Sequence, residues 1–399
     1  MGKIRRILAT DSYSNVLSSV LSILIGLLVG FIILLISNPS QAFNGFISIL
    51  VGGFSNMKDL GQVLYFATPI IMTGLSVGFA SRTGLFNIGA SGQFIAGAYV
   101  AILIGIKCTF LPGPLRWITA LLGAMLAGAI WGAIPGILKA YRNVNEVIAC
   151  IMMNYIGMYV VNYLILNTGV YESMKNQTKR VPDVANVPRM GLDKIFKTSS
   201  ATSSVNSGVV IAVLMAIVIF IILQKTTFGY ELKACGFNRE SARYAGINEN
   251  RSIIFSMMIA GALAGLGGAL LYLAGSGKGI DVVDVLAAEG FNGIPVALLG
   301  LNNPIGIIFS GLLVAHLNVG GTNMQLYGFA PQVIEIIISI IIYFSALALL
   351  FKGLINIIIK DRKKVPVSSD QSSQAPWPVK PENDENLEPD ETKSGEKGG

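Results

Sequence analysis

Two glycine-rich segments place amide and carboxyl side chains among otherwise apolar residues. The first segment, 84–97, carries Asn87 and Gln93, and the second begins at Glu289 and carries Asn292. Amide groups both donate and accept hydrogen bonds without a compensating charge. They therefore suit a neutral ligand that is rich in hydroxyl groups, or that bears a base, better than they suit an ion. We expect these four side chains to line a solute pathway.

Both segments also contain residues that interrupt helices. The first holds four glycines, and the second holds Pro295 and the pair Asn302 and Asn303 before Pro304. Glycine tolerates irregular backbone, and proline removes a backbone donor. Irregular backbone at membrane depth occurs only where it is buried in protein or faces a watery cavity. This favours a pathway lining, although small residues can also serve only to let helices pack closely.

The composition is that of a membrane protein. Of the 399 residues, 53% are hydrophobic and 13% are charged, whereas a soluble domain has about 25% charged residues. The apolar blocks lie at 16–36, 60–80, 85–106, 117–138, 147–166, 208–223, 253–273, 285–301, 305–320 and 332–351. Because three of these blocks are short, the prediction is an all-α polytopic membrane protein with about 8–10 transmembrane helices, some of them broken.

The distribution of Lys and Arg gives the orientation, because these residues concentrate in short cytoplasmic links. With ten crossings, the basic start, the links at 139–142 and 224–251, and the basic stretch 352–364 all lie inside. Both termini are therefore expected in the cytosol. The basic link 167–207 is long enough for the charge rule to weaken, and we expect it outside. The net charge of +7 comes from these links and forms no stripe typical of nucleic-acid binding.

The same topology gives the two glycine-rich segments opposite directions. Phe-Asn-Ile-Gly at 86–89 is similar to Phe-Asn-Gly-Ile at 291–294. The first lies on an inward-to-outward segment and the second on an outward-to-inward one, as an inverted repeat requires. Chance recurrence of four residues in a glycine-rich chain is the alternative.

The chain divides into three parts. Residues 1–15 form a cytosolic N-terminus, and 16–360 form the transmembrane domain with an amphipathic cytosolic link at 225–251. In the last part, 361–399, polar and acidic residues are mixed with prolines. Such a composition cannot bury enough apolar surface to offset its ordering entropy, so we expect a disordered cytosolic tail.

The amphipathic link has the residues of a short partner-binding helix. Gly236 and Asn238 can end one helix and cap the next, while Ala242 and Gly246 give the new helix a low-profile face near Arg243. A short helix of this kind suits insertion into a groove on a cytosolic partner. A merely solvated loop is the alternative.

The sequence has no recognisable catalytic motif. A G-x-x-x-x-G-K-[ST] phosphate loop is absent. The segment 275–279 has a Gly-Lys pair, but Tyr272 stands at the position of the first glycine and no Ser or Thr follows the lysine. No H-E-x-x-H motif occurs, and the three cysteines are far apart. We expect a transport subunit that is not an enzyme and holds no metal or cofactor of its own. His316 and Glu335 are ionisable residues in apolar blocks and stay open as functional candidates.

Three motifs, at 74–93, 234–247 and 290–304, resemble the permeases of the branched-chain amino acid and ribose import group of ABC transporters. The resemblance spans residues 60–351 and is strongest to permeases of nucleoside and simple-sugar importers. It implies a bacterial importer in which cytosolic subunits bind ATP, an extracellular lipoprotein receptor delivers the substrate, and a second permease subunit completes a heterodimer. It also implies that 234–247 is the helix that docks on the ATPase.

This resemblance implies ATP-driven import of nucleosides across the bacterial cytoplasmic membrane. A permease for a simple sugar such as ribose is the alternative within the same class. A secondary transporter or channel that needs no ATPase is the alternative from another class, and a membrane enzyme is the third. Uptake measured with and without an active ATPase distinguishes the importer from the autonomous transporter.

Overall fold

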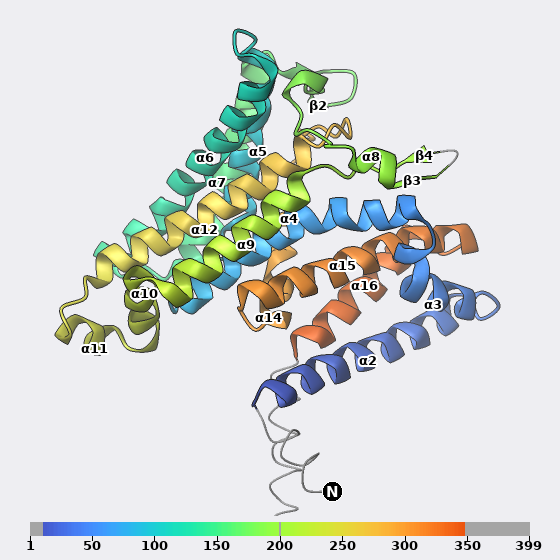
Figure 1. Ribbon diagram of the computed structural model, residues 1–399, viewed down its shortest axis with the longest axis horizontal. Helices are drawn as coiled ribbons and strands as arrows, with labels where there is room; N and C mark the ends of the chain where they lie inside the picture. The colour runs from blue at the N-terminus through green and yellow to red at the C-terminus, as the bar shows by residue number, and fades with distance from the viewer. Residues whose placement is uncertain (1–10, 199–200, 348–399) are drawn as a thin grey trace, which may run out of the picture. The chain divides into compact units, whose positions relative to one another are not determined.

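The computed structural model describes residues 11–198 and 201–347, which are almost entirely helical (Figure 1). The helices are α2 (Asp11–Ser37), α3 (Ala42–Val51), α4 (Met57–Arg82), α5 (Ala90–Lys107), α6 (Gly113–Arg142), α7 (Glu146–Asn167), α8 (Leu192–Ile195), α9 (Gly208–Lys225), α10 (Thr227–Phe237), α11 (Arg239–Tyr244), α12 (Glu249–Tyr272), α13 (Ala288–Phe291), α14 (Gly293–Leu299), α15 (Pro304–Met324) and α16 (Pro331–Ala346). Short 3-10 turns are η1 (Gly52–Phe54), η2 (Asp183–Ala185) and η3 (Gln325–Tyr327). The predicted all-α class is confirmed.

Eight helices within the described ranges are long and apolar enough to cross a membrane, namely α2, α4, α5, α6, α7, α9, α12 and α15. Two further predicted blocks have shorter helices, because 285–301 is broken into α13 and α14 and α16 has 16 residues. The blocks at 208–223 and 305–320 were expected to be marginal, yet α9 has 18 residues and α15 has 21. Helix α3 was not expected at all.

Close helix crossings form the centre of the bundle, where α12 packs against α4, α5 and α6. A Cβ atom added to Gly261 of α12 meets the carbonyl group of Gly128 on α6, and one added to Gly265 meets the carbonyl oxygen of Ala124. Helices approach this closely only where small residues line the contact. The small residues of α12 therefore allow its close packing against α6.

A second apolar cluster joins the first and last described helices. Helix α2 packs against α16, and α3 packs against α15. The buried side chains of this cluster are Leu34, Ala42, Ile49, Leu317, Met324, Phe329, Ile334, Ile337, Ile338 and Ile341. Residues 1–10 and the predicted tail 361–399 lie outside the described residues.

Two loops at one end of the bundle are hydrogen-bonded to each other, while α10 and α11 lie at the opposite end (Figure 1). The loop between α7 and α9 holds the hairpins of β1 (Tyr171–Glu172) with β2 (Gln177–Thr178) and of β3 (Lys197–Thr198) with β4 (Ala201–Thr202). The amide nitrogen of Thr178 donates to the carbonyl oxygen of Ile280 at 2.9 Å, and that of Val187 donates to Leu273 at 2.8 Å. These bonds hold the segment 273–287 against the hairpin loop.

Candidate functional site

The helix break at Asn292 is the centre of the candidate site. Helix α13 ends at Phe291 and α14 begins at Gly293, so Asn292 lies between them, as the sequence predicted. A Cβ atom at Gly293 would meet the backbone of Thr73 in α4. Only glycine lets the broken helix lie this close to α4.

The two similar glycine-rich segments contact each other. The backbone of Gly290 lies against that of Ser91, and the Ser91 hydroxyl donates to the Ala287 carbonyl oxygen at 2.8 Å. The link between α4 and α5, residues 83–89, is therefore followed at once by the part of α5 that contacts α13. The structure brings together the two breaks that the sequence singled out.

Asn87 and Gln93 form a closed amide pair in the protein interior. Asn87 Nδ2 donates to Gln93 Oε1 at 2.8 Å, and Gln93 Nε2 donates to Asn87 Oδ1 at 3.0 Å. Asn87 Nδ2 also donates to the Ser76 hydroxyl at 3.0 Å. Both amides are buried, and neither borders the clefts described next. Their place in the pathway lining stays a prediction.

Glu289 and Asn292 border a cleft of about 320 Å³ between α4, α13, α15 and α16, which we call the α16 cleft. Its remaining lining residues are Phe66, Pro69, Ile70, Leu271, Lys278, Ala288, Asn318, Thr322, Gln325, Pro331, Ile334, Glu335 and Ile338. The mixture of aromatic, amide, hydroxyl and carboxyl groups is typical of a small-molecule site. The structure thus also places Glu335, an open candidate, on this cleft.

Three polar residues of the α16 cleft were missed by the sequence analysis. Asn318, Thr322 and Gln325 follow each other along α15 and the turn after it, at intervals of four and three residues. That spacing puts side chains on one face of a helix. The polar face was therefore readable from the sequence, although its cleft was not.

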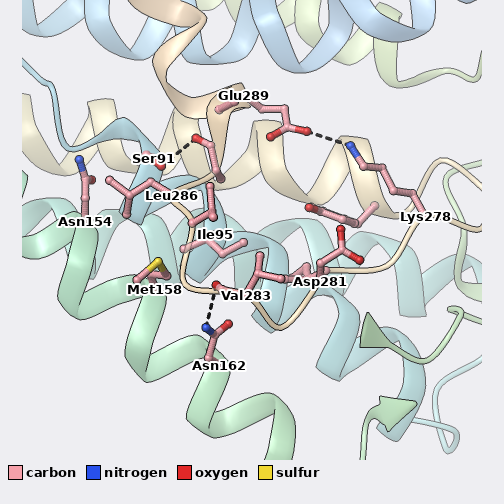
Figure 2. A pocket seen from close by; sticks show the side chains of 15 residues that line it. Ser91, Ile95, Asn154, Met158, Asn162, Lys278, Asp281, Val283, Leu286 and Glu289 are labelled. Atoms are coloured by element: carbon pink, nitrogen blue, oxygen red, sulfur yellow. Dashed lines mark hydrogen bonds and ion pairs between the residues drawn. The ribbon is translucent and has the colours of Figure 1, made fainter. Parts of the chain in front are cut away.

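A second cleft of about 170 Å³ lies on the other side of α13, between α5, α7 and the segment 280–289; we call it the α7 cleft (Figure 2). Asn162 Nδ2 on α7 donates to the Val283 carbonyl oxygen at 3.0 Å. Asn154 lies deeper, where Nδ2 donates to the Ile88 carbonyl oxygen and Oδ1 accepts from the Gly92 amide. These bonds tie α7 to the first glycine-rich segment and to the segment 273–287.

One ion pair borders both clefts. Lys278 Nζ lies 2.8 Å from Glu289 Oε1, and Lys278 and Glu289 line both the α7 cleft and the α16 cleft (Figure 2). The lysine side chain is 42% exposed and the glutamate 28%, so the pair is open to solvent on one side. Lys278 belongs to the segment held by the hairpin loop. The ion pair therefore links that loop to the broken helix.

Within residues 11–198 and 201–347, no group of three His, Cys, Asp or Glu side chains is placed to hold a metal ion. His316 of α15 lies in the packed interior, where Nε2 is 3.0 Å from the Leu50 carbonyl oxygen and the ring is 4.7 Å from that of Phe54. It borders neither cleft. His316 therefore helps to hold α15 against α3 and η1.

The predicted partner-binding link folds as α10 and α11 with a short break at Asn238. Asn238 Oδ1 accepts from the Ser241 amide at 3.0 Å and caps α11, as predicted. Gly236 does not end the preceding helix; it lies in the last turn of α10, against the backbone of residues 82–84. Ala242 is buried in this chain, and its part in a low-profile docking face stays a prediction. Arg243 is exposed, and Gly246 has a φ of 82° that favours glycine.

The fold is that of an all-α polytopic membrane protein with two polar clefts beside a broken helix. Residues 60–349 match the family described as the permease component of the branched-chain amino acid transport system, and the chain belongs to this family. The predicted family is thereby confirmed. Its members are the membrane-spanning subunits of ABC transporters, which work with ATP-binding and substrate-binding components.

Several curated proteins are similar over most of this chain. The guanosine ABC transporter permease NupP of Bacillus subtilis is 38% identical over 318 residues, which are 79% of this chain and 88% of that protein. The nucleoside ABC transporter permease NupB of Lactococcus lactis is 33% identical, covering 81% and 88%. The glucose ABC transporter permease TsgB13 of Haloferax volcanii is 31% identical, covering 80% and 84%. No solved structure matches.

Proposed function

We propose that this chain imports nucleosides across the cytoplasmic membrane, using ATP that a separate subunit binds and hydrolyses. The observation that carries the substrate class is the similarity to two nucleoside permeases over about four-fifths of the chain. The α16 cleft supports it, because Asn292, Asn318 and Thr322 can bond ribose hydroxyls and base edges. Phe66 supplies an aromatic surface on the same cleft for a base.

We propose Glu289 and Asn292 as lining residues of the translocation pathway, with the buried Asn87–Gln93 pair supporting the adjacent break. In this proposal the end with the hairpin loop faces outward, where a substrate-binding lipoprotein delivers the solute. The end with α10 and α11 and both chain termini face the cytosol. A second, non-identical permease subunit completes the pathway.

A simple sugar is the second candidate substrate. The observation that favours it is the 31% identity to a glucose permease over 80% of this chain. The hydroxyl-bonding groups of the α16 cleft serve a sugar equally well, whereas Phe66 favours a ligand that also carries a flat ring.

Initial rates of uptake separate these functions. We expect cells that express the permease with its partner subunits to take up labelled guanosine or uridine, and we expect uptake to fall to background when the ATPase subunit carries an inactivating substitution. Uptake of ribose or glucose alone would reassign the substrate. Uptake that persists with the inactive ATPase would overturn the importer and favour an autonomous transporter.

The contact with the ATPase gives a separate prediction. Phe237 and Tyr244 are 92% and 94% exposed on α10 and α11, and large aromatic residues of this kind dominate the binding energy of many interfaces. We expect Phe237→Ala combined with Tyr244→Ala to lower ATP-driven uptake about tenfold or more, because an aromatic hot spot contributes about 2 kcal/mol. The measurement is uptake together with recovery of the ATPase on affinity-purified permease.

Tyr141→Ala is the matched control for this pair. Tyr141 is also exposed and lies in the last turn of α6, outside α10 and α11. We expect it to leave both recovery and uptake near the wild-type level. Full recovery of the ATPase by the double variant would contradict the docking role of α10 and α11.

A further inference from the structure

Arg82, the last residue of α4, reaches across to the loop between α14 and α15. Its Nε donates to the Asn302 carbonyl oxygen at 2.9 Å, and its Nη2 donates to the Leu301 carbonyl oxygen at 3.1 Å. The planar guanidinium group presents its donors as a rigid fork, which a pair of adjacent carbonyls can fill. A single side chain therefore joins two segments that are about 220 positions apart in the sequence.

The turn that Arg82 holds has an unusual backbone. Leu301 has a φ of 55° and Asn302 a φ of 53°, so two successive residues other than glycine are left-handed. A left-handed residue costs about 1–2 kcal/mol, with asparagine among the more tolerant residues. The carbonyls that Arg82 binds also follow the C-terminal end of α14, where a positive charge is favourable. Arg82 thus stabilises a turn that local preferences alone disfavour.

The α10 segment packs on the same place. A Cβ atom at Gly236 would lie 2.8 Å from the Arg82 carbonyl oxygen and 3.0 Å from the Gly84 amide nitrogen. Lys233, Gly236 and Phe237 of α10 share a cleft of about 210 Å³ with Ser81, Arg82, Leu301 and Asn302. The backbones of residues 82–84 and of α10 are in direct contact, so a shift of α10 displaces the base of the Arg82 side chain.

Helix α14 connects the Arg82-bound turn to the α16 cleft. It has seven residues, with Asn292 before its first residue and the Arg82-bound turn after its last. The Val296 carbonyl oxygen accepts from the Ser310 hydroxyl of α15 at 2.8 Å, and a Cβ atom at Gly74 of α4 would lie 2.9 Å from the Val296 side chain. A short helix clamped in this way moves as one piece rather than bending.

We propose that Arg82 is the positioning residue that couples α10 and α11 to the broken helix α13–α14 during transport. Movement of α10 by the ATPase displaces residues 82–84, Arg82 pulls the turn at 300–303, and α14 shifts Asn292 in the α16 cleft. The inference rests on the proposed function, in which α10 and α11 contact the ATPase. Arg82 touches no solute and acts only through α14.

The test uses the complete importer, reconstituted with its ATP-binding and substrate-binding subunits in liposomes. Guanosine uptake and ATP hydrolysis are measured on the same preparation, and their ratio is compared among variants. We expect Arg82→Ala to lower the ratio of solute moved to ATP hydrolysed about tenfold, while hydrolysis per assembled complex changes less than twofold. Arg82→Lys keeps the charge but loses the fork, and an intermediate ratio is expected.

Arg142→Ala is the matched control, because Arg142 also ends a helix at this face and is exposed. A wild-type ratio in Arg82→Ala would overturn the proposal, and so would a parallel loss of uptake and hydrolysis, which marks a purely structural role. If Arg82→Ala does not assemble, a wild-type ratio in Arg82→Lys overturns it. Uptake by the wild-type complex without ATP hydrolysis would overturn the proposed ATP-driven import as well. The other outcomes bear only on the role of Arg82.

Discussion

Gly261→Leu is expected to remove the folded protein from the membrane fraction. A Cβ atom at Gly261 meets the carbonyl group of Gly128 and lies 3.2 Å from the Gly132 Cα, so the obstacle is backbone and not a flexible side chain. Overpacking of a core costs about 1–3 kcal/mol where side chains can move, and more where they cannot. Separation of α6 from α12 also opens the contacts that α12 makes with α4 and α5.

The measurement is the amount of detergent-soluble, monodisperse protein after expression at equal levels. Ala262→Leu is the control, because Ala262 is the next residue of α12 and is only half-buried. We expect it to leave the yield within about twofold of the wild type, in line with the small effects of most surface substitutions. An equal yield of Gly261→Leu would show that α6 and α12 do not cross as closely as described.

Glu289→Gln is expected to lower nucleoside uptake about tenfold, which is equivalent to about 1.4 kcal/mol. The carboxylate borders both clefts, and hydrogen bonds to charged groups contribute about 1.5–3 kcal/mol. Lys278→Gln is expected to have a smaller effect, since a partly exposed ion pair contributes only about 1 kcal/mol or less. The measurement is the initial uptake rate at saturating ATP, corrected for the amount of assembled complex.

Asp284→Asn provides the comparison, because Asp284 is an exposed carboxylate in the segment that carries Lys278 and lines neither cleft. It is expected to transport like the wild type. The exchange of charges, Lys278→Glu with Glu289→Lys, separates two roles of Glu289. Restored uptake would make the ion pair itself the important feature, whereas continued loss would support contact with the solute. Wild-type uptake by Glu289→Gln would contradict both roles.

Helix α13, the first part of the broken helix, borders both clefts. Lys278 and Glu289 border both clefts, so movement of the segment 273–287 affects each of them. The hairpin loop holds that segment from one end of the bundle, and Arg82 holds the other end of α14. The contacts from both ends of the molecule therefore reach the short segment that carries Glu289 and Asn292.

Several features followed from the sequence because they depend on composition or on neighbouring residues. The apolar blocks predicted the transmembrane helices, since a bilayer sets the length of apolar chain that can cross it. The cap formed by Asn238 and the helix break at Asn292 were predicted because amide side chains and glycines act on backbone within a few positions.

Only the tertiary structure decided which distant groups meet. The sequence allowed Asn87 and Gln93 to face a cleft, but in the structure their side-chain amides are hydrogen-bonded to each other in the protein interior. Ala242 is buried against the rest of the protein. Arg82 donates to backbone carbonyl oxygens about 220 positions away in the sequence. A buried polar group takes whichever partner the packing of helices brings within reach, because leaving it unpaired costs about 1–3 kcal/mol. The sequence therefore determined the helices and their breaks, while helix packing determined which side chains border the clefts.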